Sequence, residues 1–162
     1  MNSKRKEARM RRYLSVVVVG TFLLACGRGK LTPGGAVVEV SPAEAVKLIR
    51  AGGILVLDVR TMEEYKRGHI SPSLLVPYQE VRENREKIAS YGLPILVYCR
   101  SGRRSLIAAN ELVELGFRKV YNLKGGKKAL LLYLDEHPEY KDLWCTEGCP
   151  GICKGGCGCP ED

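Results

Sequence analysis

The sequence lacks an apolar run long enough to cross a bilayer, and beyond its first residues it lacks a large surplus of basic charge. Its apolar run at residues 13–25 is shorter than the ~20 residues that a transmembrane helix needs. The net charge is +8, but residues 1–25 alone hold six basic side chains against one acid. The remaining surface charge is ordinary, which argues against a nucleic-acid partner. The sequence also has no repeat at the periods of solenoid proteins.

The first 25 residues have the order of a secretory signal: a basic head, a short apolar stretch and a small residue before the break. Residues 23–27 read LLACG, which resembles the lipobox of bacterial lipoproteins. The resemblance implies cleavage before Cys26 and acylation of its sulfur, which would make the protein an exported, membrane-anchored lipoprotein of the periplasm or cell surface. The alternatives are an ordinary signal peptide and an uncleaved anchor, and both also place the domain outside the cytoplasm.

From residue 36 onward, short β-rich runs alternate with helical ones. Residues 54–59 and 95–98 are almost continuously apolar, as expected of strands buried on both faces. Such alternation predicts an α/β fold with a five-stranded, mainly parallel sheet and helices on both faces. The strands are expected at 36–40, 54–59, 74–76, 95–98 and 119–122. The helices are expected at 42–50, from Thr61, and at 78–90, 103–115 and 127–136, the first two with the capping boxes Ser41/Glu44 and Thr61/Glu64.

The fourth expected strand runs directly into Cys99, and a helix follows the next few residues. Such a junction directs backbone N–H groups at one point, and the helix N-terminus adds partial positive charge there. A thiol in that position has a pKa below the usual ~8.5 and is a nucleophilic thiolate at neutral pH. The sequence therefore predicts Cys99 as the catalytic residue, and an anionic substrate bound by Arg100, Ser101, Gly102, Arg103, Arg104 and Ser105.

Two families use a loop of this kind, and its length separates them. Cysteine-dependent phosphatases have Cys-x5-Arg, but here Ser105 stands at that position and the spacing is Cys-x4-Arg, from Cys99 to Arg104. The shorter loop resembles that of rhodanese sulfurtransferases. The resemblance extends over about residues 38–134 and rests on DVR at 58–60, EY at 64–65, GHI at 68–70, VYCRSGRRS at 97–105, GF at 116–117 and VYNLKGG at 120–126. Family members often have tryptophan shortly after the glycine pair, where this chain has KAL at 128–130.

The resemblance implies a single-domain, rhodanese-like sulfurtransferase of the thiosulfate-using type. Cys99 would take the outer sulfur of thiosulfate as a persulfide, and a thiol, cyanide or a protein would accept it. This sulfur transfer requires no cofactor. We expect His69 to pack locally, and Asp58 and Arg60 to be structural.

The last part of the chain is rich in cysteine, glycine and proline. We divide the sequence into a signal peptide at 1–25, a flexible tether at 26–35, the rhodanese-like domain at 36–140 and this tail at 141–162. Disulfides, thiolate ligation of a metal or cluster, and a sulfur relay from the active site are the three interpretations of the tail, the first two equally favoured. The alternative function is accordingly an exported sulfur carrier or metal-binding protein. The tail cysteines are Cys145, Cys149, Cys153, Cys157 and Cys159.

Overall fold

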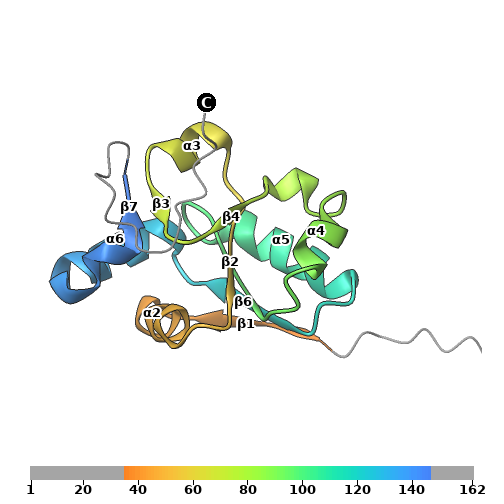
Figure 1. Cartoon of the computed structure of the whole chain (residues 1–162), viewed down its shortest axis with the longest axis horizontal. Helices are drawn as coiled ribbons and strands as arrows, with labels where there is room; N and C mark the ends of the chain where they lie inside the picture. Colours follow the sequence, from red (N-terminus) through yellow and green to blue (C-terminus); the bar gives the residue numbers. More distant parts are fainter. Residues whose placement is uncertain (1–34, 147–162) are drawn as a thin grey trace, which may run out of the picture. The chain divides into compact units, whose positions relative to one another are not determined.

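A computed structural model describes residues 35–146, in which strands and helices alternate (Figure 1). The strands are β1 Ala36–Val40, β2 Leu55–Asp58, β3 His69–Ile70, β4 Leu74–Leu75, β5 Ile95–Tyr98, β6 Lys119–Leu123 and β7 Trp144–Cys145. The helices are α2 Pro42–Ala51, α3 Met62–Lys66, α4 Arg85–Ala89, α5 Arg103–Glu114 and α6 Gly126–Glu136, with 3-10 helices η1 Tyr78–Glu80 and η2 Pro138–Leu143.

Five strands form one sheet in the order β1-β6-β5-β2-β4, and each neighbouring pair is parallel. The predicted five-stranded parallel sheet is thereby confirmed. Strand β5 lies at its centre, between β6 and β2. Because parallel strands end at a common edge, the segments that follow β2, β5 and β6 meet there.

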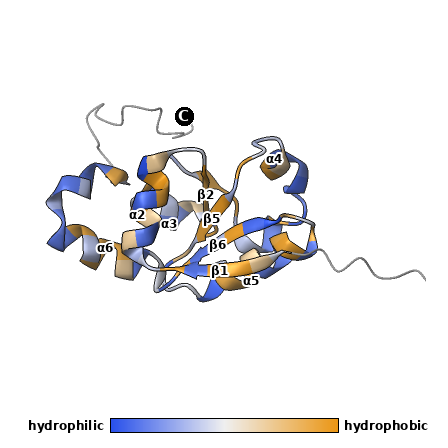
Figure 2. Ribbon diagram, turned by 90° about the horizontal axis from the view of Figure 1, so that it is seen from below, coloured by the Kyte–Doolittle hydropathy of each residue, from blue (hydrophilic) through white to orange (hydrophobic). Residues whose placement is uncertain are grey.

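The central strands are buried on both faces, and their alternating side chains build two cores. In β5, Ile95 and Val97 belong to the core that α5 covers, whereas Leu96 and Tyr98 belong to the core of α2 and α6. Figure 1 shows α4 and α5 on one side of the sheet and α2 and α6 on the other, and Figure 2 shows the hydrophobic colour of β2 and β5. Cys99 follows Ile95 and Val97 in this alternation, belongs to the same core, and so faces the α5 side.

Both predicted capping boxes are present. The Ser41 hydroxyl accepts a hydrogen bond from the Glu44 N–H at 3.3 Å, and the Thr61 hydroxyl accepts one from the Glu64 N–H at 3.3 Å. In each box the glutamate side chain also reaches back to the N-cap backbone. These local signals fix where α2 and α3 begin.

The prediction of a single helix at 78–90 is wrong, because the segment divides into η1 and α4 with turns between them. Asn84 is at the break, with φ −91° and ψ 13°. Its backbone N–H and its side-chain amide both donate to the Glu80 carbonyl, at 3.0 and 2.9 Å. The side-chain amide of Asn84 thus shares the Glu80 carbonyl with the backbone N–H at the point where the two short helices are separated.

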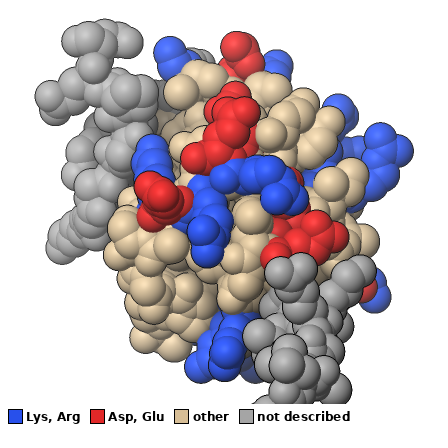
Figure 3. Space-filling model, turned by 90° about the vertical axis from the view of Figure 1, so that its right-hand side faces the viewer, with Lys and Arg blue, Asp and Glu red and all other residues tan. Residues whose placement is uncertain are grey.

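Strands β3 and β7 form a separate antiparallel pair, in which His69 is opposite Cys145 and Ile70 is opposite Trp144. The first residues of the predicted tail therefore pack on the body of the protein. The described part of the chain contains no helix with the length and apolar character needed to cross a bilayer. On the face that includes α4 and α5, basic and acidic side chains are interspersed (Figure 3).

Candidate active site

Cys99 is the first residue after β5, at the carboxyl edge of the sheet, and its side chain is buried. The backbone then turns within three residues into α5. Gly102 is the N-cap residue of this helix and has φ +92°, a conformation that glycine adopts without strain. The predicted strand–loop–helix junction is therefore present, and the thiol lies at the N-terminus of a twelve-residue helix.

Backbone N–H groups surround the sulfur of Cys99. The Gly102 N–H donates to Sγ at 3.2 Å. Burial alone would raise the pKa of Cys99, but hydrogen bonds from the Ser105 hydroxyl and from the backbone N–H groups of Ser105, Ser101 and Gly102 outweigh it, so the pKa is lowered. The loop thus stabilises the thiolate, the form that acts as a nucleophile.

The hydroxyl of Ser105 has more than one acceptor within reach. In the structure it is 2.7 Å from Oδ1 of Asn122 on β6 and 3.1 Å from the Gly102 carbonyl oxygen. A hydroxyl has a single hydrogen to donate, and an ionised sulfur attracts it more strongly than a neutral oxygen does. We therefore expect Ser105 to turn to Cys99 when the thiol ionises, while Asn122 holds the hydroxyl otherwise.

Arg104 is held by Glu64 of α3. Its Nη1 and Nη2 each donate to a different carboxylate oxygen at 2.8 Å, the geometry that fits a guanidinium to a carboxylate. The hydrogen bonds that Arg104 donates to the Glu64 carboxylate raise the pKa of Arg104, and the charge of Cys99 adds to this effect. Glu64 therefore orients an arginine that also interacts with the sulfur.

A buried ion pair fixes the position of α3. Arg60 donates from Nε to Oδ1 of Asp58 at 2.9 Å, and its two Nη atoms donate to the carbonyls of Glu64 and Gly68 at 3.1 and 2.8 Å. The hydroxyl of Tyr98 also donates to Asp58. These hydrogen bonds join the middle of α3 and the segment that follows it to β2 and β5, which supports the predicted structural role of Asp58 and Arg60.

The first turn of α6 contacts the active-site loop directly. The Lys127 and Lys128 N–H groups donate to the carbonyls of Cys99 and Arg100, at 2.8 and 3.2 Å. Gly126 precedes them with φ +57°, and a Cβ atom there would lie 2.5 Å from the Cys99 carbonyl oxygen. The α6 N-terminus thus binds the outward-facing carbonyls of the loop while the loop's own N–H groups face the sulfur.

A cavity of ≈ 670 Å³ borders this loop and extends between α3 and α6. Of the predicted substrate-binding residues, Arg100 lines it, Arg104 interacts with Glu64, and Arg103 is exposed on the first turn of α5. The lining residues are Arg60, Glu64, Arg67, Arg100, Lys127, Lys128, Leu131, Leu132 and Asp135.

His69 packs locally, as predicted. Its ring stacks on Tyr65 with centroids 3.8 Å apart, and Nδ1 is 3.1 Å from the Tyr65 carbonyl oxygen. Burial lowers the pKa of His69. The ring stacking and the Nδ1 contact are the local packing that the sequence predicts for this residue.

Cys145 is buried in β7, opposite His69. The other four tail cysteines, with Cys26, lie outside the described residues. No group of three or more metal-ligating side chains occurs within residues 35–146. The metal and disulfide interpretations of the tail, and the lipidation of Cys26, stay predictions.

The basic residues Arg67, Lys127 and Lys128 beside the loop are not apparent from the sequence motifs, and the capping box does not indicate that Glu64 also orients Arg104. The position of the two lysines in the sequence could have indicated their place beside the site. They follow directly on the Gly125-Gly126 pair at the carboxyl end of β6, the edge at which such sheets form their sites.

A model of the rhodanese-like domain matches residues 41–131. Thiosulfate sulfurtransferase GlpE of Coxiella burnetii is 39% identical over 88 residues, which are 54% of this chain and 81% of that protein. Thiosulfate sulfurtransferase 18 of Arabidopsis thaliana is 39% identical over 103 residues, 56% of this chain and 75% of that protein.

Solved structures agree with this match. A rhodanese-related protein from Thermoplasma volcanium has a TM-score of 0.53 and 29% identity, over 59% of this chain and 92% of that one. The family model spans more than half of the sequence and includes the whole segment from the Glu64 helix to the start of α6. The chain therefore belongs to the rhodanese-like domain family.

Proposed function

We propose that the protein is a sulfurtransferase that moves the outer sulfur of thiosulfate, or of a similar donor, to a thiophilic acceptor through a persulfide on Cys99. The observation that carries the proposal is the buried Cys99 thiol, whose pKa is lowered by hydrogen bonds from the Ser105 hydroxyl and from the N–H groups of its own loop. The relatives named thiosulfate sulfurtransferase support the choice of donor.

The proposed reaction has two displacement steps. The Cys99 thiolate attacks the outer sulfur of thiosulfate, the S–S bond of the donor breaks, and sulfite leaves with the bonding pair. The terminal sulfur of the resulting persulfide is then attacked by the acceptor, and the Cys99 thiolate is released. The N–H groups around Sγ stabilise the negative charge in both steps.

The arginines have separate roles in this proposal. Arg100 lines the cavity beside the loop and would attract the anionic donor. Arg104, oriented by Glu64, would stabilise the charge that sulfite carries as it leaves. Glu64 acts through Arg104 and is a positioning residue.

The main rival chemistry is phosphate hydrolysis, and the loop length argues against it. Ser105 stands where a cysteine-dependent phosphatase has its arginine. Its hydroxyl is directed toward Asn122 and Gly102 inside the protein. The loop is therefore one residue shorter than a phosphate cradle of that type.

The test is steady-state turnover of thiosulfate and cyanide by purified residues 27–162, followed as thiocyanate, with Cys99→Ser measured in parallel. We expect turnover by the parent, and loss of at least about a thousandfold in the variant because the nucleophile is gone. Absence of turnover in the parent, or equal turnover in the variant, contradicts the proposal.

We further propose that the domain acts outside the cytoplasm, anchored by lipid on Cys26. The basic head, the short apolar stretch and the cysteine after Ala25 support this proposal. Outside the cytoplasm the thiolate of Cys99 meets oxidising conditions, and burial of the sulfur would limit its exposure to oxidants.

A further inference from the structure

The cavity between α3 and α6 has a volume of ≈ 670 Å³. Thiosulfate would fill only a small part of it. The volume lies within the ~300–1,000 Å³ range of pockets that bind small organic molecules. The sulfur donor alone therefore does not account for the cavity.

Most of the charge in the cavity is positive and unneutralised. Arg60 is paired with Asp58 and Glu64 with Arg104, so these groups contribute little net charge. The charged lining residues that stay outside these pairs are Arg67, Arg100, Lys127 and Lys128, against Asp135. Burial, together with the charges of Arg60 and Arg67, lowers the pKa of Lys127. A positive potential of this kind attracts a ligand with more than one negative group.

Trp144 of β7 holds Lys127 in place from outside the family-matched segment. The Lys127 Nζ is 5.0 Å from the centroid of the Trp144 ring, and Cζ of Arg60 is 5.9 Å from the same ring. Both distances are within cation–π range. The antiparallel pairing of β7 with β3 brings the indole to this position. This chain thus uses residues beyond 131 to shape the cavity.

The cavity also has an apolar wall and lies directly against the active-site loop. Leu131 and Leu132 line it, and Leu132 is 68% exposed. Arg100 belongs to both the loop and the cavity, and the Lys127 N–H donates to the Cys99 carbonyl. A molecule with a carbon body could lie on the leucines and place its anionic groups on the lysines, beside Arg100 of the active-site loop.

We infer that this cavity binds the sulfur acceptor, and that the acceptor is a low-molecular-mass thiol carrying two or more carboxylate or phosphate groups. The inference rests on the sulfur transfer proposed above. The acceptor thiol loses its proton to solvent, and its sulfur attacks the terminal sulfur of the Cys99 persulfide. The persulfide S–S bond breaks, a new S–S bond forms on the acceptor, and the Cys99 thiolate is restored without any external oxidant or reductant.

The first experiment measures binding without turnover. Trp144 is the only tryptophan of the chain, so its fluorescence reports on the neighbourhood of Lys127. We expect S-methylglutathione, which carries two carboxylates but no thiol, to change this fluorescence saturably, and Lys127→Gln/Lys128→Gln to weaken the binding about tenfold. No saturable change, or equal affinity in the variant, overturns the inference.

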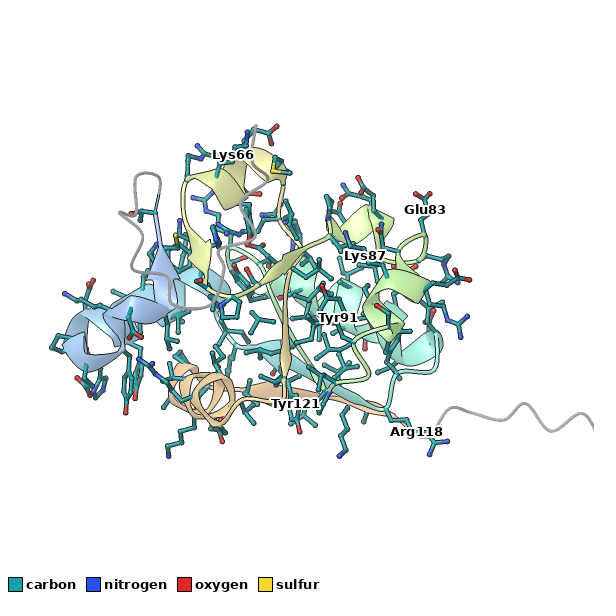
Figure 4. All side chains as sticks on the ribbon, in the orientation of Figure 1. Lys66, Glu83, Lys87, Tyr91, Arg118 and Tyr121 are labelled. Atoms are coloured by element: carbon teal, nitrogen blue, oxygen red, sulfur yellow. The ribbon has the colours of Figure 1, made fainter. Side chains whose placement is uncertain are left out.

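The matched control is Lys66→Gln/Lys87→Gln, which removes the same total charge. Figure 4 shows Lys66 on α3 and Lys87 on α4, and neither residue lines the cavity. We expect this variant to bind S-methylglutathione like the parent. Equal weakening in both variants would mean that net charge alone attracts the anion, and would also overturn the inference.

The second experiment compares acceptors with thiosulfate as the donor, followed as sulfite release. In the parent we expect mercaptosuccinate to give a higher kcat/KM than 2-mercaptoethanol. In Lys127→Gln/Lys128→Gln we expect this preference to fall about tenfold. An unchanged preference overturns the inference. Turnover with cyanide is measured alongside, since its absence would indicate failure of the proposed sulfur transfer instead.

Discussion

At the scale of single residues, the reactivity of Cys99 depends on opposing effects on one pKa. Burial favours the neutral thiol, and the hydrogen bonds of the loop favour the thiolate by a larger amount. The Ser105 hydroxyl is the largest of these favourable contributions. It is also the one that can be removed without altering the backbone.

We predict that Ser105→Ala raises the pKa of Cys99. A lowered pKa means that the thiolate forms at lower pH, so loss of the hydroxyl moves the midpoint of alkylation to higher pH. The measurement is the rate of iodoacetamide modification of the Cys99 peptide against pH, by mass spectrometry. Ser101→Ala is the control, because Ser101 acts on the sulfur through its backbone N–H, which alanine keeps. A midpoint that moves equally in both variants, or not at all, contradicts this account.

Sequence reasoning placed Cys99 at the strand–loop–helix junction because that pattern is a local feature of the chain. It missed the interaction of Glu64 with Arg104, which are 40 positions apart in the chain. The capping box alone accounts for a glutamate at this position. Only the packing of α3 beside α5 reveals the second use of its carboxylate.

At the scale of elements, the α6 N-terminus and the active-site loop approach so closely that glycine is required between them. A Cβ on Gly126 would lie 2.5 Å from the Cys99 carbonyl oxygen and 2.8 Å from the Gly102 nitrogen. The Cys99 oxygen and the Gly102 nitrogen are both backbone atoms, which cannot move aside as a flexible side chain would. The loop conformation therefore depends on α6.

We predict that Gly126→Ala displaces the loop and lowers kcat/KM for thiosulfate by about a hundredfold. Gly92→Ala is the matched control. Gly92 has φ +62°, close to the φ +57° of Gly126, but a Cβ there meets nothing within 4 Å. Both variants should lose about 1–2 kcal/mol of stability for the left-handed backbone, measured by denaturant unfolding. Equal activity in the two variants would show that the close approach does not position the loop.

The elements differ in how far the sequence predicts them. The β-rich runs and capping boxes correctly indicate the sheet strands and the helices α2, α3, α5 and α6, because burial periodicity and caps are local. The break at Asn84 coincides with a side-chain hydrogen bond to the Glu80 carbonyl, which the apolar pattern of the segment does not indicate. The β3–β7 pair consists of two-residue strands far apart in sequence, which no local pattern marks.

At the scale of the whole molecule, the proposal joins a sulfurtransferase domain to a lipid anchor. Most of the net positive charge of the chain lies in residues 1–25, as in the head of a secretory signal. Acyl chains on a single residue would then hold the domain at a membrane surface without a spanning helix. Its substrates would be those outside the cytoplasm.

We predict that the full chain, expressed in a bacterium, incorporates an acyl label and that Cys26→Ala abolishes the labelling. The expected reason is that the acyl chains are attached to the Cys26 sulfur and its new N-terminus. The Cys99→Ser variant should label normally. Labelling that persists without Cys26, or none in the parent, would refute the anchor while leaving the sulfur chemistry intact.

The most direct test of the central claim is the mass of the protein after reaction with thiosulfate in the absence of an acceptor. The account predicts that the Cys99 peptide gains the mass of one sulfur atom, that sulfite appears in equal amount, and that Cys99→Ser acquires no such sulfur. Subsequent addition of cyanide should restore the original mass. Unmodified Cys99 in the parent, or sulfur uptake by Cys99→Ser equal to that of the parent, would contradict a persulfide carried on Cys99.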